Sequence, residues 1–508
     1  MNYDQDLQSI QQARTLCTQA KTALDKMKSF TQKDVDRIVA GMVEAGNQAA
    51  KRLAELAVEE TGFGVVADKT VKNELATRRV YEYIRDMKTV GVIRDLKKDK
   101  IVEIAEPVGV IAGIIPVTNP TSTTLFKAII ALKAKNTIVF SPHPNAVKCT
   151  KATVDLLQKT IESLGAPKDA ISVITMPTIK ATEELMKNPN IAVILATGGS
   201  AMVKSAYSSG KPAYGVGPGN VPAFIERSAD VQKAVADIIT SKSFDNGTVC
   251  ASEQSIVVDK PISEEVKRAL KEHSAYLMNK QESNLVAKVL VDPQLTINPK
   301  LVGQPCHIIA KQAGFRVPEN TTLLVAELDG VGKDYPLSIE KLSPVIAYYE
   351  VDGWEQGCSR CIELLKFGGM GHTLAIHSNN RDIIMEFALK KPAYRIVVNT
   401  PSTHGAVGYT TNLPPSLTLG CGTHGGNITS DNISPQHLIN IKRLAFETRP
   451  LSHDRSSTPG VFSIGQKKLI TEKDVRQAIA HGAKIKLDKN VIVTPLAKDL
   501  GKERGVFE

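Results

Sequence analysis

From residue 108 onward, short runs that are apolar at almost every position alternate with stretches of helical pattern. The runs occupy residues 108–115, 137–140, 171–174 and 191–196. A strand that is apolar at consecutive positions must be covered on both faces, as strands are in a parallel sheet between two layers of helices. The pattern therefore predicts an α/β fold. Ligands are expected at the loops that follow the carboxyl ends of these strands.

The chain has 508 residues, which is enough for two or three domains with sizeable cores. Its net charge of +10 is spread along the sequence, aromatic residues make up 5%, and we find no arginine-rich arm. These features argue against a nucleic-acid-binding surface. The apolar runs are too short to cross a bilayer, so insertion into a membrane is not expected.

Seven cysteines are scattered without the spacing of a disulfide framework, at positions 17, 149, 250, 306, 358, 361 and 421. The first residues, Met1–Asp6, lack the basic and apolar parts of a signal peptide. Both features predict a reducing, cytoplasmic location. Cys358 and Cys361 form a C-x-x-C pattern within a predicted helix, for which a zinc or redox role is not favoured. The spacing of the histidines predicts no metal site.

Cys250 is the cysteine with the most informative surroundings. It follows an Asp-Asn-Gly-Thr turn, Asp245–Thr248, and precedes a polar run that leads into an apolar strand at 255–259. A thiol in a turn, beside backbone N–H groups that stabilise the thiolate, can serve as a nucleophile. A lone cysteine is more often a small buried apolar residue. The segment alone leaves both interpretations open.

Two of the loops expected at strand ends contain polar groups. The hydroxyl-rich loop 116–124 holds Asn119, whose amide could donate to a developing oxyanion, although a simple turn asparagine is the alternative. The loop Thr197–Ser200 precedes a helix whose first N–H groups suit a pyrophosphate, but the G-x-G-x-x-G fingerprint is absent. Further along, His372, His404 and His424 lie in glycine-rich loops, where structural or substrate-lining roles are expected.

Taken together, these segments resemble the CoA-acylating aldehyde dehydrogenases, most closely the aldehyde dehydrogenase half of bifunctional alcohol/aldehyde dehydrogenases. The likeness covers about residues 5–445. Besides the Cys250 segment, the matching motifs are, in order, Ala105–Gly109, Thr118–Thr123, Phe140–Pro144, Ile194–Ser200, Tyr207–Pro212, Glu340–Pro344 and Pro415–Gly422. An iron-dependent alcohol dehydrogenase half is not expected.

The resemblance implies an aldehyde dehydrogenase-like α/β fold. It has a Rossmann-like parallel-sheet cofactor domain, an α/β catalytic domain and a small extension that builds a homodimer or a larger homo-oligomer. The expected boundaries are 1–235 for the cofactor domain, with an oligomerisation hairpin near 90–107, 236–425 for the catalytic domain, 426–449 for a return segment, 450–466 for a linker and 467–508 for a C-terminal module.

The resemblance also assigns roles to individual residues. Cys250 becomes the nucleophile, and Asn119 with the backbone N–H of Cys250 forms the oxyanion hole. Residues expected near the nicotinamide cofactor are Thr118, Ser141, His143, Thr197, Gly198, Gly199 and Glu340. The expected cofactor is NAD, with NADP as the alternative because Ser141–Pro144 lacks the carboxylate that would hold a 2′-hydroxyl. His404 and His424 are candidates for lining the substrate.

One departure from the hydrolytic relatives bears on the reaction. Those enzymes carry a glutamate in a Glu-Leu-Gly-Gly-Lys motif, whereas the corresponding stretch here, Gly215–Asn220, has no carboxylate. A positioned base typically contributes ~10²–10⁴-fold to attack by water, whereas a thiol already holds some thiolate near neutral pH. Coenzyme A is therefore favoured over water as the acyl acceptor.

The predicted reaction is the reversible conversion of acetaldehyde or propionaldehyde into the acyl-CoA. Three alternatives remain open at this point. The enzyme could act on sulfoacetaldehyde, it could be a hydrolytic aldehyde dehydrogenase, or the chain could be a non-catalytic assembly protein that keeps the fold.

After the linker, residues 467–508 read as a compact unit. Thr471 is expected to cap a helix with Asp474 three residues on, and Gly482 to end it. Strands at 485–487 and 491–493 and a short helix after Thr494 follow. A unit of this size scarcely folds alone. It is similar to segments of bacterial microcompartment enzymes, which favours recruitment by shell proteins. A role limited to oligomer contacts is the alternative.

Overall fold

The computed structural model describes residues 4–449 and 467–508, so the predicted linker 450–466 lies outside the described residues. The chain divides into two compact units, Met1–Leu444 and Ala445–Glu508. Within the described ranges, no helix combines the length and the apolar character needed to span a bilayer.

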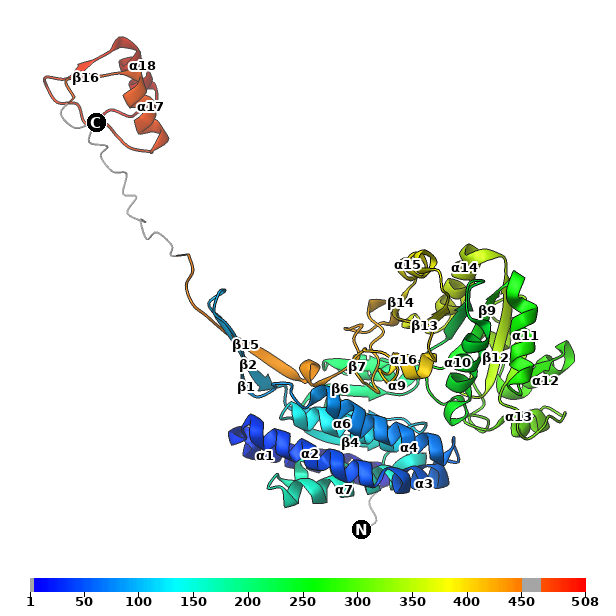
Figure 1. Cartoon of the computed structure of the whole chain (residues 1–508). Coiled ribbons are helices and arrows are strands. Elements are labelled where there is room, and N and C mark those ends of the chain that lie inside the picture. The colour runs from blue at the N-terminus through cyan, green and yellow to red at the C-terminus, as the bar shows by residue number, and fades with distance from the viewer. Residues whose placement is uncertain (1–3, 450–466) are drawn as a thin grey trace. The chain divides into compact units, whose positions relative to one another are not determined.

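The first sheet of the larger unit has five parallel strands, and four of them match the apolar runs predicted from the sequence (Figure 1). Their order across the sheet is β5 (Ile171–Val173), β4 (Thr137–Pro142), β3 (Val110–Ile115), β6 (Ile191–Thr197) and β7 (Ala213–Val216). The chain runs outward from β3 to β5 on one side and continues with β6 on the other. The carboxyl ends of β4, β3 and β6 are therefore adjacent, at the point where such sheets bind ligands.

Helices cover both faces of this sheet, as the apolar strands require. One face packs against α1 (Gln5–Lys26), α8 (Ile179–Lys187) and α9 (Ser200–Tyr207). The other packs against α6 (Pro120–Lys133) and α7 (Val147–Ser163). Every residue of α6 is buried, because the outer helices lie over it. These are α2 (Gln32–Gln48), α3 (Ala50–Thr61) and α4 (Val66–Glu74), and α5 (Val80–Ile84) follows.

A second sheet of seven parallel strands forms the rest of the α/β core. Its order is β10 (Tyr276–Met278), β11 (Leu324–Glu327), β12 (Val345–Val351), β9 (Glu253–Asp259), β8 (Val221–Ile225), β13 (Gly371–His377) and β14 (Ala393–Val398). The expected domain boundary at 235 leaves β8 with the cofactor domain, yet β8 pairs with β9 and β13. The division between the sheets therefore falls between β7 and β8.

The helices of the second sheet also lie on both of its faces. On one side are α10 (Val231–Ser243) and α11 (Ser263–Glu272), and on the other α14 (Gly353–Phe367) and α15 (Arg381–Leu389). The remaining helices are α12 (Lys280–Leu290), α13 (Cys306–Gln312) and α16 (Ser402–Ala406). Cys358 and Cys361 are buried in α14, in the helix that the sequence predicts.

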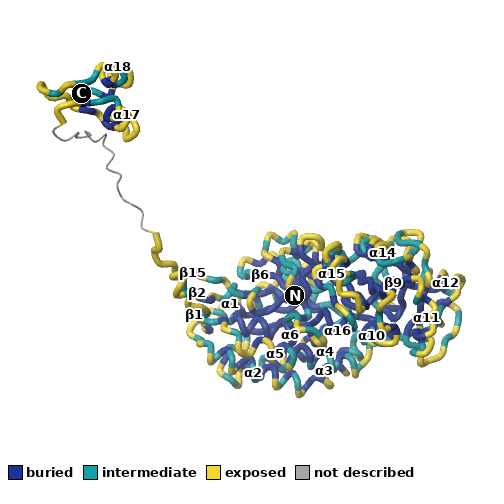
Figure 2. The backbone as a smooth tube through the Cα atoms, turned by 45° about the horizontal axis from the view of Figure 1, so that its top comes forward, coloured by how far each residue is buried: buried dark blue, intermediate teal, exposed yellow. Residues whose placement is uncertain are grey.

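A small sheet of three strands lies apart from these layers. β1 (Gly91–Leu96) and β2 (Ile101–Pro107) form the antiparallel hairpin expected near 90–107, and the return segment adds β15 (Ile439–Ala445) beside β2. The Glu103 carboxylate pairs with Arg94 of β1 and Arg443 of β15. In contrast to the buried strands of the large sheets, β1 and β15 are mostly exposed (Figure 2).

The smaller unit contains β16 (Leu469–Ile470), α17 (Glu472–Ala480), β17 (Ile492–Val493) and α18 (Pro495–Glu503). Thr471 and Asp474 form the predicted capping box at the start of α17. The predicted strand at 485–487 is wrong. Ile485 makes an isolated parallel bridge to Phe507, and backbone hydrogen bonds join Ile485 and Leu487 to Val506 and Glu508 without extending into a strand.

Candidate active site

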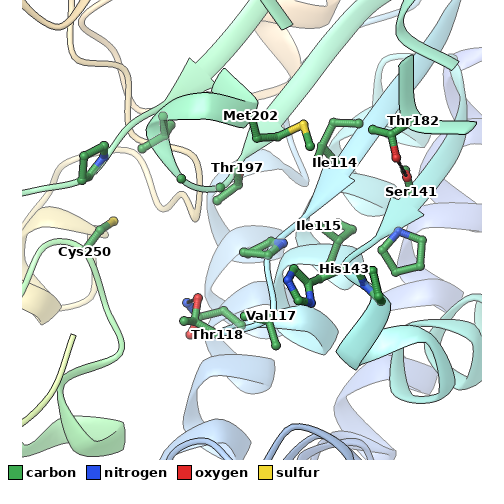
Figure 3. A pocket seen from close by; sticks show the side chains of 18 of the residues that line it. Ile114, Ile115, Val117, Thr118, Ser141, His143, Thr182, Thr197, Met202 and Cys250 are labelled. Carbon is green, nitrogen blue, oxygen red and sulfur yellow. Dashed lines mark hydrogen bonds between the residues drawn. The ribbon is translucent and has the colours of Figure 1, made fainter. Parts of the chain in front are cut away.

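The loops after β3, β4 and β6 surround a cavity of about 390 Å³. It is lined by all the residues that the sequence assigns to the nucleophile, the oxyanion donor and the cofactor: Cys250, Asn119, Thr118, Ser141, His143, Thr197, Gly198, Gly199 and Glu340. Figure 3 shows Cys250 at one end of this cavity and the hydrogen-bonded hydroxyls of Ser141 and Thr182 at the other. A long molecule could therefore contact both ends.

A second, smaller cavity of about 70 Å³ shares Cys250, Asn119 and Thr197 with the first. Its other lining residues are mainly apolar or aromatic: Val71, Leu75, Phe244, Val249, Val407, Tyr409, Leu417 and Leu419, with Lys72, Thr123, Thr403 and His404. The sulfur of Cys250 therefore stands between a large cavity, which carries hydroxyls, backbone glycines and the Glu340 carboxylate among apolar side chains, and a small cavity that is mainly apolar.

The two histidines proposed to line the substrate have different positions. His404 lines the small cavity and contacts the rings of Phe244 and Tyr409. His424 is exposed, stacks on Tyr394 and belongs to neither cavity. Only the first of the two predicted positions is near the site.

Cys250 follows a strained turn between α10 and β9. Asp245 and Asn246 both have φ of 52°, in the left-handed region that Asp and Asn tolerate better than most residues. The carboxylate of Asp245 fixes the turn by accepting hydrogen bonds from the backbone of Val65 at 2.7 Å and from the hydroxyl of Thr248 at 2.6 Å. The Asp-Asn-Gly-Thr turn thus forms as the sequence predicts.

The thiol is less acidic than the sequence argument assumed. Burial raises the pKa of Cys250 to about 12, the Glu340 carboxylate adds to this effect, and Arg395 opposes it. The rise in pKa caused by the loss of solvation therefore exceeds the lowering caused by the backbone N–H groups, and the resting form of the sulfur is the thiol. Its proton must leave when the sulfur attacks.

Glu340 reaches the large cavity from the loop before β12. Its Oε1 accepts a hydrogen bond from the backbone N–H of Gly219 at 3.0 Å, and burial raises the pKa of its carboxyl to about 7. The next residue, Lys341, donates to the carbonyls of Leu337 and Ile339 at 2.7 Å each and so holds this loop in place. Among the described residues that line the two cavities, Glu340 is the only carboxylate.

Asn119 is the residue before the first turn of α6, but its side chain makes no capping bond. Its Nδ2 donates to Thr118 Oγ1 at 3.0 Å, and its Oδ1 accepts from the ammonium of Lys72 at 2.6 Å. Nδ2 also makes a long contact of 3.5 Å with the backbone carbonyl of Thr248, and the amide lies at the edge of both cavities.

Sequence reasoning missed two buried lysines near Cys250. Lys69 and Lys72 of α4 bind the Asp245 carboxylate. The spacing of three residues in an amphipathic helix predicts that the two lysines share one face. It does not predict that this face is buried. His372 is also fully buried, and its Nε2 has no hydrogen-bond partner among the described residues. Burial lowers the pKa of His372 to about 3, so the ring is neutral.

Residues 5–295 match the aldehyde dehydrogenase family. The chain belongs to the aldehyde dehydrogenase family. It is 42% identical over 442 residues to the bifunctional aldehyde-alcohol dehydrogenase AdhE of Escherichia coli K12, a match that covers 86% of this chain and 50% of the relative. The chain thus spans about half the length of that curated relative.

Solved structures of other aldehyde dehydrogenases are similar over most of their length. The acetylating aldehyde dehydrogenase of Geobacillus thermoglucosidasius is 53% identical with a TM-score of 0.87, covering 89% of this chain and 99% of that one. The propionaldehyde dehydrogenase of Rhodopseudomonas palustris, solved with bound propionyl-CoA, is 27% identical with a TM-score of 0.77, covering 85% and 94%.

In this aldehyde dehydrogenase, the segment Gly215–Asn220 lies directly against the cysteine loop. A Cβ atom on Gly219 would meet the backbone oxygen of Cys250 at 2.2 Å, and Val216, Gly217 and Pro218 line the large cavity. The segment that carries a glutamate in hydrolytic relatives is thus near the sulfur but supplies no carboxylate.

Replacing Gly219 with alanine should displace the backbone of Cys250. Because a misplacement of about 1 Å can cost ~10²-fold in rate, we expect Gly219→Ala to lower kcat/KM for the aldehyde by about 100-fold. Gly368→Ala is the matched control, since its Cβ would make an ordinary contact with Asn220 at 3.5 Å. Equal activity of the two variants in steady-state assays would contradict the close approach.

Proposed function

We propose that this protein is a CoA-acylating aldehyde dehydrogenase that converts a short-chain aldehyde into the corresponding acyl-CoA, with a nicotinamide dinucleotide as hydride acceptor. The observation that carries the proposal is the position of Cys250 between two cavities whose only carboxylate, among the described lining residues, is Glu340. The site offers a sulfur nucleophile but no positioned base that would favour water as the acyl acceptor.

The chain's own residues provide the steps of acyl transfer. The Cys250 thiol gives its proton to solvent as the sulfur adds to the aldehyde carbon, and the Asn119 amide and the backbone N–H of Cys250 hold the resulting oxyanion. Loss of a hydride from this adduct leaves an acyl thioester on Cys250. The thiol of coenzyme A then attacks the thioester and releases acyl-CoA, and because one thioester replaces another the reaction is reversible.

The large cavity fits a dinucleotide. A Cβ on Gly199 would meet nothing within 4 Å, so the backbone at the start of α9 is open to a phosphate group. We propose that Thr197, Gly198 and Gly199 hold the phosphates, Glu340 the ribose next to the nicotinamide, and Ser141 and His143 the adenosine end. When bound, the cofactor supplies the hydride acceptor. NAD is the proposed cofactor and NADP the alternative, because no carboxylate in Ser141–Pro144 selects against a 2′-phosphate.

The choice between coenzyme A and water follows from the groups around the thioester. Glu340 Oε1 is engaged with Gly219 N–H, and no side chain of Gly215–Asn220 can activate water. A missing base costs hydrolysis ~10²–10⁴-fold, whereas a thiol needs less help because part of it is already thiolate near neutral pH.

The small cavity supports an apolar substrate side chain. Its lining is mostly aliphatic and aromatic, which suits the alkyl group of acetaldehyde or propionaldehyde. The sulfonate of sulfoacetaldehyde would need a free cation there. The ammonium of Lys72 is bound to Asp245 and Asn119, and burial lowers the pKa of His404. The alkyl aldehydes are therefore the better supported substrates.

Assembly is also a proposal. The exposed strands β1 and β15 offer a surface for a homodimer or larger homo-oligomer, with Val92 and Leu444 57% and 50% exposed. For the unit that contains 467–508 we propose a docking role toward microcompartment shell proteins, which would place the enzyme in the cytoplasm inside such a compartment.

Product analysis tests the proposed reaction. With propionaldehyde, NAD and coenzyme A, the enzyme should form propionyl-CoA in step with reduced cofactor, and Cys250→Ser should lower this rate by about 10³-fold or more. Rapid release of free propionate without coenzyme A would mean a hydrolytic enzyme. Absence of any aldehyde-dependent cofactor reduction would favour the non-catalytic assembly protein.

Cofactor choice can be tested by adding the missing carboxylate. His143→Glu should raise the ratio of kcat/KM with NAD to kcat/KM with NADP by about tenfold, since a carboxylate accepts the 2′-hydroxyl and repels a 2′-phosphate. His143→Gln serves as the uncharged control. An unchanged ratio in His143→Glu would place the adenosine elsewhere.

Deleting residues 467–508 tests the docking role. The truncated enzyme should keep its turnover per site but lose co-localisation with shell proteins in cells that form the compartment. If the truncated enzyme is encapsulated as well as the full chain, the docking role is wrong. A role limited to oligomer contacts would then be favoured.

A further inference from the structure

Three charged side chains are buried together behind Asn119. Lys69 and Lys72 come from α4 and are 2% and 4% exposed, and the fully buried Asp245 comes from the turn before Cys250. Burying charge is costly unless the groups are paired and hydrogen-bonded. We therefore asked which function this costly cluster serves beside the nucleophile.

The contacts of Lys72 account for all three of its ammonium protons. Nζ donates to the Asp245 carboxylate, to Thr248 Oγ1 at 3.1 Å and to Asn119 Oδ1 at 2.6 Å. Since an amide presents its oxygen and its nitrogen on opposite sides, the contact with Oδ1 turns Nδ2 the other way. Nδ2 donates to Thr118 Oγ1 at 3.0 Å and to the backbone carbonyl of Thr248, in the cysteine loop, at 3.5 Å. Lys72 thus decides which end of the amide faces the reacting carbon.

Lys69 provides an internal comparison. Its Nζ also donates to Asp245, at 2.9 Å, but its second contact is the backbone carbonyl of Thr118 at 2.8 Å. The two lysines share one counter-ion and one burial environment. They differ in that Lys69 holds the backbone before Asn119, whereas Lys72 holds the amide itself.

We propose that Lys72 is a positioning residue for the aldehyde oxidation, whose ammonium orients the Asn119 amide and strengthens it as the donor to the oxyanion. This inference rests on the proposed function. A positive charge on the oxygen side of the amide draws electron density from the N–H groups, and in a site of low dielectric this cooperative effect is stronger than in water. The donor is also held in place before charge develops, which is the condition for effective oxyanion stabilisation.

The groups around Lys72 define its pH response. Asp245 and, farther away, Asp68 favour the charged form, while Lys69 disfavours it. Lys72 Nζ also lies 5.4 Å from the centroid of the Phe244 ring. Its charge adds to the effect of burial in lowering the pKa of His404. Burial is the largest influence and lowers the pKa of Lys72 to about 8. The ammonium is therefore present below pH 8 and lost as the pH rises above it, so the oxidation step should slow above pH 8.

The test measures the rate of the first turnover in the absence of coenzyme A. This burst is monitored as the appearance of reduced cofactor. In Lys72→Met the rate of this burst should fall about 10- to 100-fold, somewhat less than the ~10²–10³-fold loss caused by removing an oxyanion donor. The aldehyde KM should change less than threefold, and the decline above pH 8 should disappear. Lys72→Arg should recover part of the rate, because it restores the charge.

Two controls separate positioning from general support of the fold. Lys69→Met removes the same charge from the same carboxylate but keeps the amide contact, so it should lose less than Lys72→Met and keep the decline above pH 8. In a double-mutant cycle, Lys72→Met combined with Asn119→Ala should be no slower than Asn119→Ala alone. Losses that multiply in the double variant would show that Lys72 acts by another route and would overturn the inference.

The wild-type enzyme tests the idea even if a variant does not fold. A burst rate that stays constant through pH 8 to 9.5 would contradict a role for the Lys72 ammonium. Failure of the proposed function has a different signature. In that case the wild-type enzyme would reduce no cofactor with aldehyde, or would release carboxylate, whatever residue stands at position 72.

Discussion

The carboxylate of Asp245 joins the three segments that form the site. It accepts hydrogen bonds from Val65 at the start of α4, from both lysines of that helix and from Thr248 beside the nucleophile. Through Lys72 the same cluster reaches the Asn119 loop of the first sheet. A fully buried charge can stay ionised only if it is paired in this way. The position of the cysteine relative to the amide therefore depends on this one charged contact.

Cys250 also lies where two cavities of different size meet. The small cavity suits the alkyl part of a substrate, and the large one, which adds hydroxyls and the glycines before α9 to its apolar lining, suits a dinucleotide or coenzyme A. A covalent thioester at their junction can stay in place while the larger molecules are exchanged. Gly215–Asn220 supplies no carboxylate, and among the described lining residues the one carboxylate, Glu340, is bound by the backbone N–H of Gly219.

Much of the fold could be predicted because local patterns and tertiary packing agree. Strands apolar at every position became the buried sheet, and the turn before Cys250 has the residues that its left-handed backbone favours. The domain boundary at 235 stays a prediction, while the division between the sheets falls between β7 and β8, since sheet membership depends on pairing partners distant in sequence. The predicted strand at 485–487 is wrong, since pairing there is limited to a bridge between Ile485 and Phe507, and an apolar pattern does not reveal the extent of pairing.

The site could be predicted only in part. Motif residues such as Asn119 lie in loops at strand ends, where sheet topology brings them together. The lysines of α4 carry no such signal, because nothing local shows that a helix face rich in lysine will be buried. The acidity of Cys250 was misjudged for the same reason, since burial, a tertiary property, raises its pKa above the value that local dipoles favour.

The central claim is that the acyl thioester on Cys250 is stable to hydrolysis and is released by transfer of the acyl group to coenzyme A. Mass spectrometry of the intact protein, mixed with propionaldehyde and NAD, measures this directly. The account predicts a propionyl adduct on Cys250 that persists in buffer and disappears on addition of coenzyme A. An adduct that is lost equally fast without coenzyme A, or that forms on another residue, would contradict it.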